Sequence, residues 1–276
     1  MVGPNPPSKS QWQKKPTLSH FLCLPLVTEI SRPQLDRSLG QFKAEVCADG
    51  PGDLTTRDES GTSAAAQSLS AKAIRPLGTL HLTLGVMTLN QDQLAKAVEL
   101  LRSLDVATLL QPSSVDSKSE SESGQSQNTT AHALTIDLKG LESMHDPEST
   151  SILYVAPSDR TERLYAFCLA LQRHFEEFIV SDDRPLKLHA TIVNTIYAKS
   201  KNSASRSQGH GPKARGSSKI DATAVLRKYH DFVWAENFRL DRIAICEMGA
   251  KKIMDAAKVR VVEERYTEVA SAALPS

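Results

Sequence analysis

Residues 78–87 read GTLHLTLGVM and residues 187–195 read KLHATIVNT. In both stretches apolar residues alternate with polar or small ones, with the period of two that a β-strand with one buried face requires. We therefore predict two strands, each with an apolar buried face and, on the other face, a histidine followed two residues later by a threonine. This repeated pattern decides the fold, because it marks one equivalent strand in each half of the chain.

The polar faces of these strands carry His81 with Thr83 and His189 with Thr191. Histidine suits proton transfer near neutral pH, because its ordinary pKa of about 6.5 leaves both protonation states populated. Hydrolysis of a phosphodiester needs one group to accept a proton and another to protonate the departing oxygen, and two imidazoles can divide that work. Threonine hydroxyls can donate to phosphate oxygens. We predict that the histidines are catalytic and that the threonines bind phosphate.

The H-x-[ST] spacing alone is weak evidence. A chain with eight histidines that is rich in serine and threonine would give about one such match by chance. The context makes the evidence stronger, because both matches fall in alternating strands at equivalent places in two similar halves. Side chains on a packed sheet also hold their geometry well. Gly85 is expected to leave room beside the site.

Composition limits the classes of protein. The 276 residues, 40% of them apolar, can bury one large core or two small lobes. A formal net charge of +1 gives no overall field toward nucleic acid or membrane, so a polyanion site must be local. The four cysteines lack C-x-x-C spacing, which argues against a zinc site or a disulfide framework. The absence of a leader or a long apolar stretch predicts an intracellular protein without membrane association.

The remaining patterns predict strands alternating with helices, and therefore an α+β fold. Helix starts are indicated by the capping-box spacings Ser31 to Gln34 and Asp159 to Glu162, and by Asn90 to Gln93. The helix after Glu162 is expected to extend towards Ile179. Further strands are expected at residues 17–24, 131–138, 151–156, 186–197, 238–246 and 259–265, and a further helix at 222–229.

The predicted domain organisation is a disordered tail at residues 1–16, one domain at 17–270 and a short tail at 271–276. Three segments within the domain have low-complexity compositions rich in small and polar residues. We expect them to be irregular inserts at about 49–73, 111–130 and 199–219.

The two motifs resemble those of the two-histidine (2H) phosphoesterase superfamily, which includes the LigT-type RNA cyclic phosphodiesterases. Asn194-Thr195, which ends the second motif, is similar to the branch shared by the A-kinase-anchoring-protein phosphoesterase-like domain and the activating signal cointegrator subunit. The similarity covers about residues 17–269. It implies two pseudo-symmetric lobes, each a curved antiparallel sheet backed by helices, with the motif residues in a central cleft. It also implies neither a metal nor another cofactor.

Two functions remain open on this resemblance. The first is a metal-independent phosphodiesterase that acts on a 2′,3′-cyclic phosphate or a terminal phosphodiester of RNA or a nucleotide. The second is a non-catalytic module that binds a nucleoside monophosphate or serves as a scaffold in a transcription or repair coactivator complex. RNA or a nucleotide is the expected substrate, with protein partners in such a complex also possible. We expect a monomer in the nucleus, the cytoplasm or both.

Other candidate residues have simpler interpretations. His20 has no threonine two residues on, which favours a strand-face role, and His174 with Glu177 fits a solvated helix face better than a metal site. Neither Lys187, which precedes the second motif, nor Arg75 has a motif to support a phosphate-binding role. The basic insert at 199–219 could contact an RNA backbone, although solvated loops often have this composition.

Overall fold

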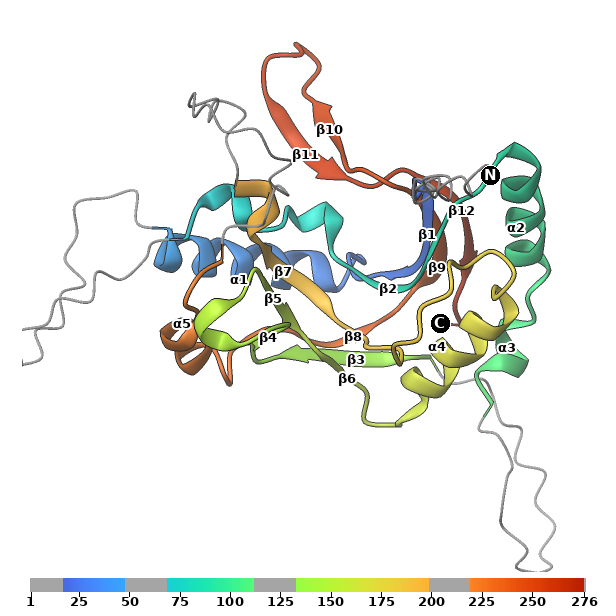
Figure 1. Ribbon diagram of the computed structural model, residues 1–276, viewed down its shortest axis with the longest axis horizontal. Helices are drawn as coiled ribbons and strands as arrows, with labels where there is room; N and C mark the ends of the chain where they lie inside the picture. Colours follow the sequence, from blue (N-terminus) through green and yellow to red (C-terminus); the bar gives the residue numbers. More distant parts are fainter. Residues whose placement is uncertain (1–16, 48–68, 112–132, 199–218, 276) are drawn as a thin grey trace, which may run out of the picture.

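The computed structural model describes residues 17–47, 69–111, 133–198 and 219–275 (Figure 1). Its strands are β1 (His20–Pro25), β2 (His81–Met87), β3 (Thr135–Lys139), β4 (Glu142–Ser143), β5 (Ile152–Val155), β6 (Pro157–Ser158), β7 (Ala190–Asn194), β8 (Val233–Arg239), β9 (Arg242–Glu247), β10 (Lys251–Met254), β11 (Val261–Arg265) and β12 (Glu268–Ala273). Its α-helices are α1 (Ser31–Val46), α2 (Gln91–Ser103), α3 (Val106–Leu109), α4 (Arg163–His174) and α5 (Thr223–Lys228). Short 3-10 turns are η1 (Ala71–Ala73), η2 (Leu77–Thr79), η3 (Pro147–Ser149) and η4 (Thr195–Ala198).

The main sheet contains both histidine motifs near its centre. Its strand order is β12-β9-β1-β2-β7-β5-β4, and every recorded pairing within it is antiparallel. A second sheet has the order β6-β3-β8, and β10 with β11 forms a hairpin that projects from the body (Figure 1). The predicted α+β class with antiparallel sheets is therefore confirmed. The two motif strands are direct neighbours, and strands from the end of the chain complete the sheet beside β1.

The core explains why β2 lies where it does. Its leucines at Leu82 and Leu84 are buried, as the alternation predicts, and α4 packs against this strand. The buried side of α4 carries Leu164, Phe167 and Leu171. Burying side chains of this size stabilises the fold by about 1.5–3 kcal/mol each, so the leucine face fixes which way the histidine face points.

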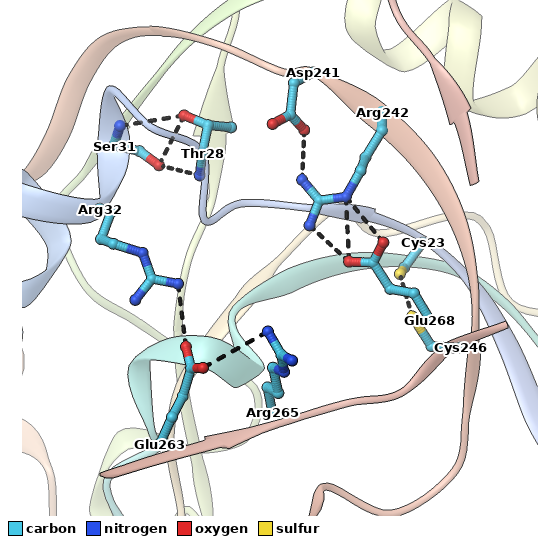
Figure 2. Close-up of polar contacts among 10 residues, drawn as sticks. All are labelled: Cys23, Thr28, Ser31, Arg32, Asp241, Arg242, Cys246, Glu263, Arg265 and Glu268. Carbon is cyan, nitrogen blue, oxygen red and sulfur yellow. Dashed lines mark hydrogen bonds and ion pairs between the residues drawn. The ribbon is translucent and has the colours of Figure 1, made fainter. Parts of the chain in front are cut away.

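The helix starts at Ser31 and Asn90 are confirmed, but the capping boxes predicted at Ser31 and Asp159 do not form. The Ser31 hydroxyl donates to the Leu26 carbonyl (2.6 Å) and accepts from the Thr28 backbone N–H (2.9 Å), so it closes the turn before α1 (Figure 2). The helix α4 begins at Arg163, and the Asp159 carboxylate accepts from the backbone N–H groups of its first two residues. It ends at His174 and not near Ile179, as predicted. In α2, Asn90 and Gln93 form a full capping box.

Several predicted element boundaries also change. The stretch 238–246 contains the end of β8 and most of β9, with a break at residues 240–241, because the chain leaves one sheet for another. The strand predicted at 78–87 begins only at residue 81, after η2, and the strand predicted at 186–197 is reduced to β7 and the η4 turn. Period-two patterning marked these strands correctly but not where their pairing partners end.

The expected inserts and tails lie largely outside the described residues. The tail at 1–16 and most of the inserts at 49–73, 111–130 and 199–219 belong to the undescribed part. Where ends of these segments are described, the structure corrects them. Leu69 and Ala73 are buried in the core, so the first insert ends before residue 69. Ala273 still pairs with Arg242 in the sheet, so the predicted C-terminal tail begins too early.

Candidate active site

The four motif residues come together on one face of the β2–β7 pair. The recorded bridge joins Leu82 to Ala190 in antiparallel fashion. Because alternate side chains share a face, His81, Thr83, His189 and Thr191 all lie on the face opposite to that of Leu82 and Ala190. His189 was predicted to lie within a strand, but β7 begins one residue later, at Ala190.

Both imidazoles are fixed by the same local hydrogen bond. The Nδ1 atom of His81 lies 2.7 Å from the Thr79 carbonyl, and that of His189 lies 2.7 Å from the Lys187 carbonyl. A carbonyl oxygen can only accept, so Nδ1 carries the proton in both rings. In the neutral rings Nε2 is then the unprotonated nitrogen. The site thus holds two imidazoles whose Nε2 atoms can take or return a proton.

The threonine hydroxyls are available to a ligand. Within the described part of the chain, neither Thr83 nor Thr191 makes a side-chain hydrogen bond, and both residues are partly exposed. Polar groups in such positions are satisfied by solvent or by a bound molecule. The hydroxyls can therefore donate to an anion placed between the strands.

His81 lies in the more enclosed of the two positions. Its ring centroid is 4.9 Å from that of Phe21 and 5.2 Å from that of Tyr266. Burial lowers the pKa of His81 to about 4, and the charges of Arg75 and His189 act in the same direction. Desolvation and nearby cations both disfavour the imidazolium form. His81 is consequently neutral at pH 7.

His189 is supported by a different aromatic ring. Tyr154 is buried, and its ring meets the His189 imidazole edge to face with 5.6 Å between centroids. The Tyr154 hydroxyl donates to the Glu142 carboxylate, and burial together with this contact raises the pKa of the tyrosine. The Lys187 ammonium lies 4.6 Å from the centroid of the tyrosine ring. Lys187 therefore contributes its carbonyl to His189 and its charge to Tyr154.

The space beside His81 is small, with a volume of about 90 Å³. Figure 2 shows the ion pairs of the charged residues that line it. Arg242 binds the Glu268 carboxylate through Nη2 at 2.6 Å and Nε at 3.1 Å, and its Nη1 binds Asp241 at 2.7 Å. Glu263 lies 3.1 Å from Arg32 and 3.7 Å from Arg265. These arginines already have carboxylate partners.

The room expected above Gly85 is filled, so that prediction is wrong. A Cβ atom at this position would lie 2.5 Å from Cδ1 and 2.7 Å from Cγ1 of Ile179. Ile179 also bridges to Met87 at the end of β2. The glycine lets the segment after α4 pack directly on the histidine face, which closes that end of the strand pair.

Aromatic neighbours of the histidines could not be predicted from the sequence. Neither Tyr154 nor Tyr266 lies in a recognisable motif, so no local signal marked these two tyrosines as neighbours of the histidines. The other histidine candidates are not brought into this site. His20 bonds Ser19 (2.9 Å between Nδ1 and Oγ), and His174 ends α4. Among the described residues, no group of three or more His, Cys, Asp or Glu is placed to hold a metal ion.

Comparison with known proteins identifies the class of this fold and site. Residues 18–256 match the family model of the AKAP7 2′5′ RNA ligase-like domain. The chain belongs to this family, which lies within the LigT-like 2H phosphoesterases. This confirms the resemblance seen in the two motifs.

Individual proteins are also similar to this chain, at low sequence identity. The Schizosaccharomyces pombe protein C15D4.13c, described as uncharacterized, is 30% identical over 118 residues, which span 42% of this chain and 50% of that protein. The crystal structure of E. coli LigT complexed with 3′-AMP has a TM-score of 0.47 and 13% identity, covering 94% of this chain and 99% of that chain. A crystal structure described as a phosphoesterase has a TM-score of 0.45 and 13% identity, covering 94% and 100%. Family membership rests on the sequence match.

Within the described residues, no helix is both long and apolar enough to cross a bilayer.

Proposed function

We propose that this protein is a phosphodiesterase that hydrolyses a 2′,3′-cyclic phosphate or a terminal phosphodiester of RNA or a nucleotide. The observation that carries the proposal is the matched state of the two histidines. Both donate from Nδ1 to a backbone carbonyl two residues earlier, and so both keep Nε2 for proton transfer. The hydroxyls of Thr83 and Thr191, on the same face, would supply the donors that a phosphate requires.

We assign the roles of the histidines from their surroundings. His81 is neutral at pH 7, so its Nε2 accepts a proton from the attacking water as the new P–O bond forms. His189, on the neighbouring strand, acts in its imidazolium form and gives its Nε2 proton to the ribose oxygen as the bond between that oxygen and phosphorus breaks. For a cyclic phosphate the product is a terminal phosphate monoester. Water supplies the atoms, so no other reactant is needed.

Thr83 and Thr191 are proposed to hold the phosphate during this step. Their hydroxyls donate to the non-bridging oxygens, where negative charge gathers in the transition state. The four side chains share one face of the β2–β7 pair, and we place the phosphate on this face, between the two Nε2 atoms.

The test is a substrate panel of nucleoside 2′,3′-cyclic phosphates and oligoribonucleotides, assayed in EDTA. We expect product from the wild type, and a loss of about a hundredfold or more in kcat for His81→Ala and His189→Ala. His174→Ala is the matched control and should keep full activity. Activity that survives either motif substitution, or that EDTA abolishes, would contradict the proposal.

The alternative is a nucleotide-binding or scaffold module without turnover. Calorimetric binding of a nucleoside monophosphate, with no product from any member of the panel, would favour it. Protein partners in a coactivator complex, a monomeric state and a location in the nucleus or cytoplasm remain predictions of the family resemblance.

A further inference from the structure

Arg75 is a buried cation with an unusual set of neighbours. It is only 7% exposed, and its backbone N–H donates to the Ile192 carbonyl of β7 (2.8 Å). The guanidinium lies 4.0 Å from the centroid of the Tyr197 ring, and its Nη2 donates to the Tyr266 hydroxyl (3.4 Å). Among the described residues it forms no ion pair with a carboxylate. One long hydrogen bond and one ring leave most of its donors unused.

A guanidinium in this state is costly to bury. Removing a charge from water is repaid only when an opposite charge and further hydrogen bonds replace the lost hydration. Arg242 shows the usual solution in the same protein, since it is held by both Glu268 and Asp241. Arg75 has no such carboxylate in the described structure, and a bound anion would balance its charge.

A cavity of suitable size opens beside Arg75. It has a volume of about 670 Å³, within the range of small-molecule sites. The charged side chains that line it are four basic and two acidic: Lys43, Lys72, Arg75, Lys252, Asp36 and Glu264. The ring of Tyr197, which is 49% exposed, also lines it and offers a face on which a base can stack.

Arg75 is linked to the histidine site through Tyr266. Arg75 donates to the hydroxyl of Tyr266, and the ring of Tyr266 lies edge-on to the imidazole of His81 with 5.2 Å between centroids. The positive charge of Arg75 also acts on the His81 imidazole. A nucleotide with phosphates on both sides of one ribose would offer one phosphate to each of these positions.

We propose that Arg75 and Tyr197 form a subsite for a second phosphate and its nucleoside, beside the phosphate held between the histidines. This rests on the proposed function and deepens it. The substrate class is then an oligonucleotide, or a nucleotide with at least two phosphates, in preference to a mononucleotide. Arg75 binds the flanking phosphate, and Tyr197 holds the guanidinium in plane and stacks the adjoining base.

The test compares two probes by calorimetry at fixed ionic strength, adenosine 3′-monophosphate and adenosine 3′,5′-bisphosphate. We expect the wild type to bind the bisphosphate at least tenfold more tightly, since a charge-assisted hydrogen bond is worth about this factor. Arg75→Met should reduce the preference to about threefold or less. Arg160→Met, which removes one exposed charge outside this cavity, is the matched control and should keep it. Equal affinities in the wild type, or an unchanged preference in Arg75→Met, would overturn the proposal.

A second measurement separates binding from a structural role. Because Arg75 is buried with no carboxylate partner in the part of the chain that the structure describes, Arg75→Met should leave the thermal unfolding midpoint of the unliganded protein unchanged or raise it. A clearly lower midpoint would mean that Arg75 serves the fold and would count against the subsite. Tyr197→Ala truncates a half-exposed ring and should also weaken bisphosphate binding, by about threefold or more. Unchanged binding in this variant would contradict the role given to Tyr197.

Failure of this subsite can be distinguished from failure of the proposed hydrolysis. Both probes are bound at equilibrium, so the measurement needs no turnover. An Arg75-dependent preference in a protein that hydrolyses nothing would keep the subsite and reject catalysis. Turnover without that preference would do the reverse.

Discussion

Leu82 of β2 pairs with Ala190 of β7, and within the described residues this is the one recorded bridge between the two motif strands. Neighbouring strands of the same sheet, such as β1 and β2, pair over six positions. A single bridge holds the two strands together at their crossing point and lets them diverge on either side. On the histidine face, His81 and His189 are both partly exposed.

The first prediction concerns the pH dependence of stability. His81 has a pKa of about 4 in the folded protein and about 6.5 when unfolded, so between these values the unfolded state binds more protons. The stabilising contribution is complete above pH 6.5 and is lost as the pH falls towards 4. It amounts to at most roughly 3 kcal/mol. Urea unfolding of wild type and His81→Gln at pH 7.5, 5.5 and 4.5 measures it.

The comparison removes the contributions of other titrating groups. The wild type should lose more stability on acidification than His81→Gln, by up to about 3 kcal/mol. Parallel curves for the two proteins would show that the imidazole is not desolvated as the structure indicates.

The second prediction concerns Gly85. An added Cβ would overlap three atoms of the Ile179 side chain, all closer than 3.0 Å. Gly85→Ala should therefore lower the free energy of unfolding by about 1–3 kcal/mol. Gly40→Ala, in α1, is the matched control, because a Cβ added at this position would have no atom within 4 Å. This substitution should raise the free energy of unfolding by about 0.5–1 kcal/mol. Chemical denaturation measures both.

A double-mutant cycle locates the cause. In an Ile179→Ala background the cost of Gly85→Ala should become much smaller, because the overlapping atoms are gone. The same cost in both backgrounds would mean that Ile179 does not pack on the glycine.

The third prediction concerns Tyr154 as a positioning residue for His189. Tyr154→Phe keeps the ring against the imidazole and loses the bond to Glu142, so kcat should stay within a few-fold while stability falls by about 1–3 kcal/mol. Tyr154→Leu removes the ring, and kcat should fall by about ten- to a hundredfold, with KM much less affected. Steady-state kinetics and thermal unfolding check the two effects. Similar kcat values for the two variants would exclude a role of the ring.

Part of the site was predictable from local sequence. Alternation in residues 78–87 places His81 and Thr83 on one face whatever surrounds the strand, because the period of a strand is a property of its backbone. The same holds for His189 and Thr191. Their common face, the α+β class and the family therefore follow from local patterns and motifs in the chain.

Short-range capping was predicted less well. Asn90 forms its capping box because the hydrogen bonds lie within one turn of α2. Ser31 has the same spacing to Gln34, but the side chain of Gln34 donates to the Glu236 carbonyl, far along the chain. The Gln34 side chain therefore makes a tertiary hydrogen bond in place of the local one that the spacing predicted.

The sequence by itself determined which side chains are the candidates for the chemistry and which way they point from their strands. Only the tertiary structure decided that Leu82 lies opposite Ala190, that Tyr266 and Tyr154 contact the two imidazoles, and that Arg75 is buried with no carboxylate partner among the described residues. The reason is physical. Strand periodicity is set by neighbouring peptide units, whereas register, burial and charge pairing depend on segments that meet only when the chain folds.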